Sequence, residues 1–135
     1  MSENSGFQFT TPKLRGLIFQ LNDSYSGPQN IKIENIFDTN ITHIDSEEHI
    51  ALVSLSFHVE NANGDLPFKI DCVIDAKFRW DDSFDETTLS ILLNQNAPAL
   101  LLSYLRPIVF NITSSALPGG GYSIPFMNFT KRQQD

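Results

Sequence analysis

The feature that most constrains the fold is the alternation of apolar and polar side chains from Leu66 to Trp80. Every even position in this stretch is apolar, and the odd positions carry mostly charged side chains such as Lys69, Asp71 and Asp75. A period of two residues places successive side chains on opposite sides of a strand and excludes a helix. The stretch therefore predicts a long strand in an antiparallel sheet, with one face covered and the other in water.

Three further segments share this periodicity. His49 to Glu60 repeats it clearly, whereas Ile31 to Ile41 and Leu14 to Leu21 carry it more weakly. The turn between the two strongest strands contains Asn63-Gly64, a pair that favours a hairpin because glycine tolerates positive φ. We expect loops elsewhere, at Ser24–Asn30 and His43–Glu48, and hence four strands in all.

The period changes to that of a helix after Asp81. A short helix is expected from Asp85 to Leu93, an interruption at Asn94–Asn96, and a long helix to about Ser115. Asn96 is the expected N-cap of the long helix, and Pro107 should kink it. Apolar side chains spaced three or four residues apart should pack this helix onto the sheet: Leu101, Tyr104, Leu105, Ile108, Val109 and Ile112.

Strands followed by helices define an α+β fold. We predict a four-stranded antiparallel sheet covered on one face by a long C-terminal helix. One domain should span 1–135, with the sheet in 1–80, the helices in 85–115 and a short terminal segment with a polar tail in 116–135.

Composition and charge exclude several classes of protein. A net charge of −7 opposes binding to nucleic acid, which requires clustered lysine and arginine. A single cysteine, Cys72, allows no internal disulfide bond. The polar start and the absence of a long apolar run predict neither a signal peptide nor a membrane span, so we expect a cytoplasmic protein that does not bind membranes.

Motifs for catalysis or cofactor binding are lacking, so we expect a protein that is not an enzyme and uses no cofactor. The acidic segment Asp45–His49 is the only candidate for an enzyme or small-ligand site. Its carboxylates and histidine resemble metal ligands, but acidic loops are usually only solvated, so no metal is expected.

The stretch Asn96-Ala97-Pro98-Ala99-Leu100-Leu101-Leu102-Ser103-Tyr104-Leu105-Arg106 resembles the signature of the SecB chaperone family, N-x-P-x-L-L-F-P-Y-x-R. The family then has a Gly- and Pro-containing turn and a P-x-N-F element, which correspond here to Gly119–Gly121 and Pro125–Phe129. Ser103 replaces the family proline, and Pro107 is an additional departure. The family's second helix and acidic metal-binding tail have no counterpart here.

This resemblance implies an ATP-independent holdase that binds unfolded or precursor polypeptides, as a homotetramer built from two dimers. It supports chaperone activity better than export, because the missing tail is what docks the SecA motor. The alternative is a dedicated interaction module for one partner, such as an antitoxin or a translocase component.

Candidate site residues follow from the resemblance and from the aromatic excess, eleven Phe in all. The residues expected to bind clients are Ile31, Ile33, Phe37, Trp80, Tyr122, Phe126 and Phe129. Those expected at the interface between subunits are Leu100, Leu102, Arg106 and Phe110.

Overall fold

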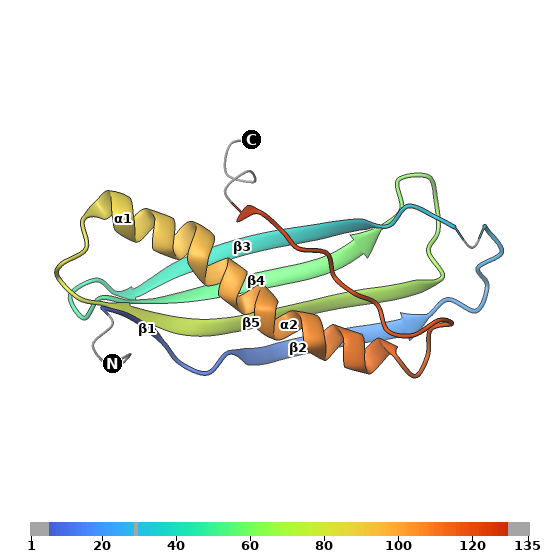
Figure 1. Cartoon of the computed structure of the whole chain (residues 1–135), viewed down its shortest axis with the longest axis horizontal. Coiled ribbons are helices and arrows are strands. Elements are labelled where there is room, and N and C mark those ends of the chain that lie inside the picture. Colours follow the sequence, from blue (N-terminus) through green and yellow to red (C-terminus); the bar gives the residue numbers. More distant parts are fainter. Residues whose placement is uncertain (1–5, 29, 130–135) are drawn as a thin grey trace.

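A computed structural model of the chain describes residues 6–28 and 30–129. The polar tail expected at 131–135 lies outside these ranges. The described part is an antiparallel sheet with one long helical rod lying across one of its faces (Figure 1). The predicted α+β fold with a C-terminal helix over one face is confirmed.

The sheet contains five strands within the described residues, in place of the four predicted. These are β1 (Phe7–Phe9), β2 (Lys13–Leu21), β3 (Glu34–Asp45), β4 (Ile50–Glu60) and β5 (Phe68–Trp80). β3, β4 and β5 are successive hairpin neighbours, and both β1 and β2 pair with the other edge of β5. β1 and β2 thus form one edge of the sheet, broken at Thr10–Pro12, where proline has no N–H to donate.

The predicted alternation of β5 matches its burial. Its even-numbered side chains from Phe68 to Trp80 are all buried, and Lys69, Asp71, Lys77 and Arg79 on the other face are exposed. β4 pairs with β5 in continuous register from Ile50↔Arg79 to His58↔Asp71. We call the face that carries the even-numbered side chains of β5 the inner face, and the opposite one the outer face.

Strand boundaries near the loops differ from the prediction. β3 begins at Glu34 rather than Ile31 and runs through the expected loop to Asp45, with a bulge between His43 and Asp45. The hairpin at Asn61–Asp65 is confirmed, with Gly64 at φ 145°.

The helical region is continuous where an interruption was expected. α1 (Glu86–Ile91) leads through a π-helical turn, η2 (Leu92–Asn96), into α2 (Ala97–Thr113). Asp85 caps α1 by accepting a hydrogen bond from the Thr88 N–H at 2.7 Å, which holds the pKa of that carboxyl below its usual value. Asn96 makes no side-chain cap, so that prediction is wrong: the helix already runs through it.

α2 crosses the inner face of the sheet diagonally (Figure 1). The chain then reverses and runs back over the sheet toward β3 (Figure 1). α2 buries one stripe of side chains against the sheet: Ala97, Pro98, Leu101, Leu102, Leu105, Val109 and Thr113. Tyr104 and Ile112 were predicted in this stripe but are 41% and 40% exposed, because one helix on a sheet buries only its lower face.

Candidate functional site

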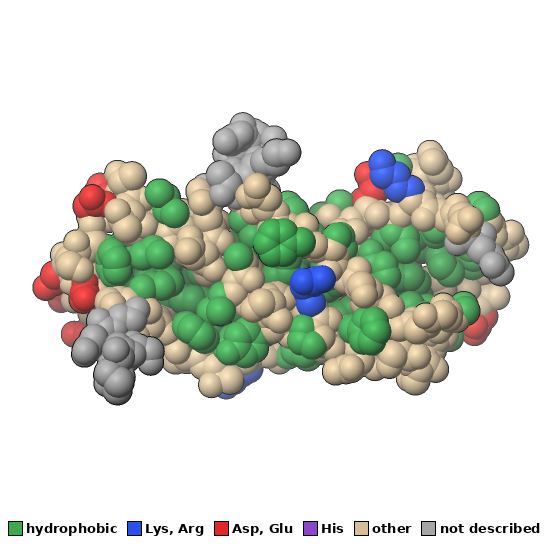
Figure 2. Space-filling model, viewed as in Figure 1, with side chains coloured by type: hydrophobic (Ala, Val, Ile, Leu, Met, Phe, Trp, Pro, Cys, Tyr) green, Lys and Arg blue, Asp and Glu red, His purple; other side chains and the backbone are tan. Residues whose placement is uncertain are grey.

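The inner face is wider than a single helix, and apolar side chains remain accessible on both sides of α2. Figure 2 shows hydrophobic side chains spread over this face of the molecule, with acidic side chains near its ends. Exposed large hydrophobic residues among the elements that lie on this face include Phe9, Leu21, Ile91, Tyr104, Phe110, Ile112 and Phe126. Exposed apolar surface that is rimmed by polar groups is typical of a binding surface.

The segment Gly121–Phe129, which we call the strap, covers part of this face beyond α2. Gly119 and Gly120 reverse the chain before it, at φ 83° and 111°, where a side chain would strain the backbone. Gly121 then passes so close to α2 that a Cβ there would lie 2.3 Å from the Phe110 carbonyl oxygen. Glycine is therefore required for the strap to start against the helix.

Side chains of α2 hold the backbone of the strap. The Tyr122 N–H donates to the Thr113 hydroxyl at 2.7 Å, and the Arg106 Nε donates to the Ile124 carbonyl at 2.8 Å. The Tyr122 hydroxyl also bonds to the Asn35 side chain on β3. The strap pairs with no strand of the sheet, so side chains supply the hydrogen bonds that a neighbouring strand would otherwise supply to its backbone.

Some apolar side chains of the strap pack against the inner face, and others between them point into solvent. Ile124 is fully buried and Phe129 nearly so, whereas Phe126 points into solvent with 83% of its surface exposed. The Tyr122 ring packs on Phe68 of β5 with centroids 5.6 Å apart. Partial burial also raises the pKa of the Tyr122 hydroxyl. The inner face thus accommodates an extended polypeptide segment of this chain.

Three of the predicted client-binding residues come together at the strap. Phe129 packs edge-on against Phe37, with ring centroids 6.2 Å apart, and Tyr122 reaches β3 through Asn35. Ile31 and Ile33 are half-buried in the segment that precedes β3. Of the seven, Phe126 is the most exposed, and the other six are buried or half-buried.

Trp80 does not join this group. It ends β5 at the opposite end of the strand from Phe68, is buried, and packs edge-on against His49 at 5.9 Å. The seven predicted residues therefore do not form one contiguous site, and their role in binding stays a prediction.

The predicted interface residues lie on different sides of α2. Leu102 is buried in the core of this subunit, and Leu100 is half-buried. Phe110 is 42% exposed, and Arg106 is exposed although its Nε holds the strap. The contribution of these residues to an interface between subunits also stays a prediction.

Sequence reasoning missed an aromatic cluster at the N-terminal edge. Phe7 and Phe9 pack against Phe78 with ring centroids 5.5 and 5.9 Å apart, and Phe9 meets the exposed Tyr104 edge-on. The alternation in Phe7-Gln8-Phe9 was a signal for β1, but the strand is too short to be assigned from periodicity alone.

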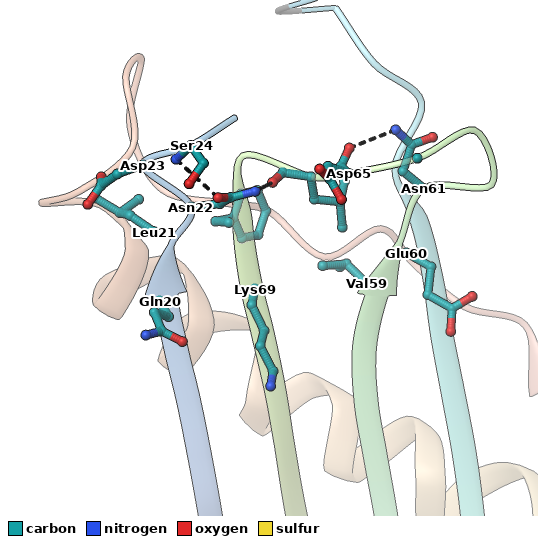
Figure 3. Close-up of a pocket in the computed structure, with 13 residues that line it drawn as sticks. Gln20, Leu21, Asn22, Asp23, Ser24, Val59, Glu60, Asn61, Asp65 and Lys69 are labelled. Carbon is teal, nitrogen blue, oxygen red and sulfur yellow. Dashed lines mark hydrogen bonds between the residues drawn. The ribbon is translucent and has the colours of Figure 1, made fainter. Parts of the chain in front are cut away.

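A polar cleft of about 750 Å³ lies at the end of the sheet, between the end of β2 and the β4–β5 turn (Figure 3). The Asn22 amide donates to the Leu66 carbonyl and the Asn61 amide to the Asp65 carbonyl, both at 2.9 Å. These amides fix the two turns that form the cleft. Figure 3 shows Lys69 and Glu60 on neighbouring strands without a group of catalytic side chains converging between them.

The acidic segment after β3 folds as a turn around its own carboxylate. Asp45 accepts hydrogen bonds from the Glu47 and Glu48 N–H groups at 3.0 and 3.1 Å. His49, at φ 60°, bonds Asp82 through Nε2 at 3.0 Å. Among the residues that the structure describes, no group of three or more His, Cys, Asp or Glu is arranged to hold a metal ion.

Cys72 points into the core from β5. Burial raises the pKa of its thiol to about 12, and the charge of Asp71 adds to this effect. Because the thiolate is the reactive form, this side chain is unreactive near neutral pH.

Neither a protein-family profile nor a curated protein matches this sequence. Solved structures do resemble the fold. The SecB-like chaperone Rv1957 of Mycobacterium tuberculosis, in complex with a ChAD peptide from the antitoxin HigA1, matches with a TM-score of 0.67 and 16% identity, over 90% of this chain and 88% of that one. A protein of unknown function from Streptococcus agalactiae matches with a TM-score of 0.51 and 14% identity, over 89% of this chain and 97% of that one.

The fold is therefore that of a SecB-like chaperone. In the described part of the chain, no helix has the length and apolar character that crossing a membrane requires.

Proposed function

We propose that this protein is an ATP-independent holdase, which binds unfolded polypeptides on the inner face of the sheet and is not an enzyme. The observation that carries the proposal is the strap. It is an extended segment held by side-chain bonds to its backbone and by apolar side chains set into the inner face. An unfolded client offers the same two features, backbone groups and intermittent apolar side chains.

Physical chemistry supports this use of the face. Exposed residues such as Phe9, Tyr104 and Phe126 offer apolar area, at about 25 cal/mol for each Å² that a client covers. Several weak contacts along one client then add through avidity. The net charge of −7 keeps assemblies apart and attracts basic clients.

The proposal places the protein in the cytoplasm as a homotetramer, and it covers the holding of polypeptides rather than their export. A second candidate is a dedicated module for one partner. It is favoured by the neighbour of similar fold, which was solved with a peptide from an antitoxin.

Suppression of aggregation tests the holdase directly. Several unrelated, chemically unfolded clients are diluted into buffer with this protein, and light scattering is followed. We expect suppression at near-stoichiometric amounts for all of them. The variant Phe126→Ser should need several-fold more protein, because it removes the most exposed aromatic ring of the face.

Ile18→Ser is the matched control, since Ile18 is 54% exposed but lies on the outer face opposite Asp71. It should suppress aggregation as well as the wild type. A failure to suppress with every client would reject the holdase. Capture of a single partner from cell extract, without suppression, would favour the dedicated module.

A further inference from the structure

The outer face of the sheet carries a local concentration of positive charge in an acidic protein. Lys13, Arg15, Lys77 and Arg79 gather beside the break between β1 and β2, and they are four of the nine Lys and Arg residues. The strand register places them together, because Lys13 pairs with Asp75 and Gln8 with Arg79. We call these four residues the basic end of the outer face.

Two hydrogen bonds to Thr10 fix the geometry at this end. The Thr10 N–H donates to the Lys77 carbonyl at 2.9 Å, and the Lys77 N–H donates to the Thr10 hydroxyl at 3.0 Å. Thr10, in the break between β1 and β2, is thus held against Lys77 of β5, one of the four basic residues.

Only one of the four cations is neutralised by a neighbour in the described part of the chain. Arg15 forms an ion pair with the buried carboxylate of Asp75 at 2.8 Å. Lys13, Lys77 and Arg79 are exposed and form no ion pair with a described residue.

The acids that follow β5 keep their negative charge and lie beyond Arg79. Asp81 accepts hydrogen bonds from Ser83, and Asp82 bonds His49. The carboxylate of Asp71 lies further along β5, opposite His58. Asp45 pairs with Ile50, and Ile50 pairs with Arg79, so the acids gather at the Arg79 end of this group. The surplus of positive charge therefore lies at Lys13 and Lys77, further from these acids.

A cleft of about 400 Å³ adjoins the cations. It is lined by Gln8, Thr10, Ile50, Lys77 and Arg79, among others. Ile50 is half-buried and lies opposite Arg79 on the neighbouring strand, so the cleft combines one apolar side chain with the donors of Lys77 and Arg79.

We propose that the basic end of the outer face binds an extended acidic segment of a partner polypeptide, with carboxylates at alternate positions. Lys77 and Arg79 are two residues apart on one strand, roughly 6.8 Å at the usual rise per residue, which equals the spacing of alternate side chains in an extended peptide. Nucleic acid fits less well, because it carries a negative charge at every nucleotide and its phosphates beyond these few cations would be repelled by the acidic protein, whereas a short segment with alternate carboxylates matches the cations in number.

Binding of a short labelled peptide in which glutamate alternates with threonine tests this site, by fluorescence anisotropy on the full chain. The wild type should bind it in a salt-dependent manner and should not bind a peptide with glutamine in place of glutamate. The double variant Lys77→Gln/Arg79→Gln should bind roughly tenfold more weakly, as expected for the loss of two partly exposed charge pairs.

The double variant Lys32→Gln/Lys69→Gln is the control, because it removes the same net charge from exposed positions elsewhere. It should retain the affinity of the wild type. Equal loss in both variants, or no binding of the acidic peptide, overturns the proposal. Stronger binding of oligothymidylate or of phosphatidylglycerol vesicles than of the peptide also overturns it. Client aggregation is not measured here, so the outcome is separate from that of the holdase.

Discussion

Thr113 shows how a single side chain joins the strap to the helix. Its hydroxyl donates to the Val109 carbonyl at 2.8 Å and accepts from the Tyr122 N–H at 2.7 Å, and the residue is fully buried. One hydroxyl thus forms hydrogen bonds with both the C-terminal end of α2 and the backbone N–H of Tyr122 in the strap. A buried N–H that loses its partner is costly, whereas an exposed one is hydrated.

Thr113→Val should therefore lower the free energy of unfolding by about 1–3 kcal/mol, since valine keeps the volume but leaves the Tyr122 N–H unpaired. Chemical denaturation measures this loss, and hydrogen exchange at Tyr122 should accelerate. Ser114→Ala is the neighbouring control, because it removes an exposed hydroxyl that donates to the Asn111 carbonyl within the helix end and does not contact the strap backbone at Tyr122. Equal stability of Thr113→Val and the wild type would contradict this role.

Elements differ in how far their sequence predicts them. β5 and β4 were predicted because one buried face imposes a strict alternation from Phe68 to Trp80. β1 was missed because Phe7–Phe9 is short and Pro12 follows soon after. The strap could not be predicted, since its bonds join Arg106 to Ile124 and Tyr122 to Asn35, contacts that only the tertiary fold creates.

α2 also has an outward side that the sheet leaves uncovered. Phe110 is 42% exposed there, and Tyr104 and Ile112 are similarly accessible. An apolar helix side in a small domain gains stability when a second subunit covers it.

We accordingly expect the wild type to sediment as a tetramer at micromolar concentration. Phe110→Glu should shift it toward smaller species, because a charge at an apolar interface costs desolvation. Gln20→Glu, on the outer face, changes the charge equally and should leave the mass unchanged. A single-subunit mass for the wild type would contradict the expected assembly.

Across the whole molecule, the two faces of the sheet carry different kinds of side chain. The inner face is apolar and partly covered by α2 and the strap, and the outer face is polar with a basic end. This division was predictable from the alternation of β5. The incomplete cover of the inner face was not, because it depends on the path of α2 and on where the strap lies.

Photo-crosslinking is the most direct measurement of where unfolded polypeptide binds. A photoreactive amino acid is placed at Phe126 on the strap or at Ile18 on the outer face, both highly exposed positions. Irradiation in the presence of an unfolded client should give crosslinks from position 126 and few from position 18, and a folded form of the same client should give none. Equal crosslinking from both positions, or crosslinking from position 18 alone, would contradict binding on the inner face.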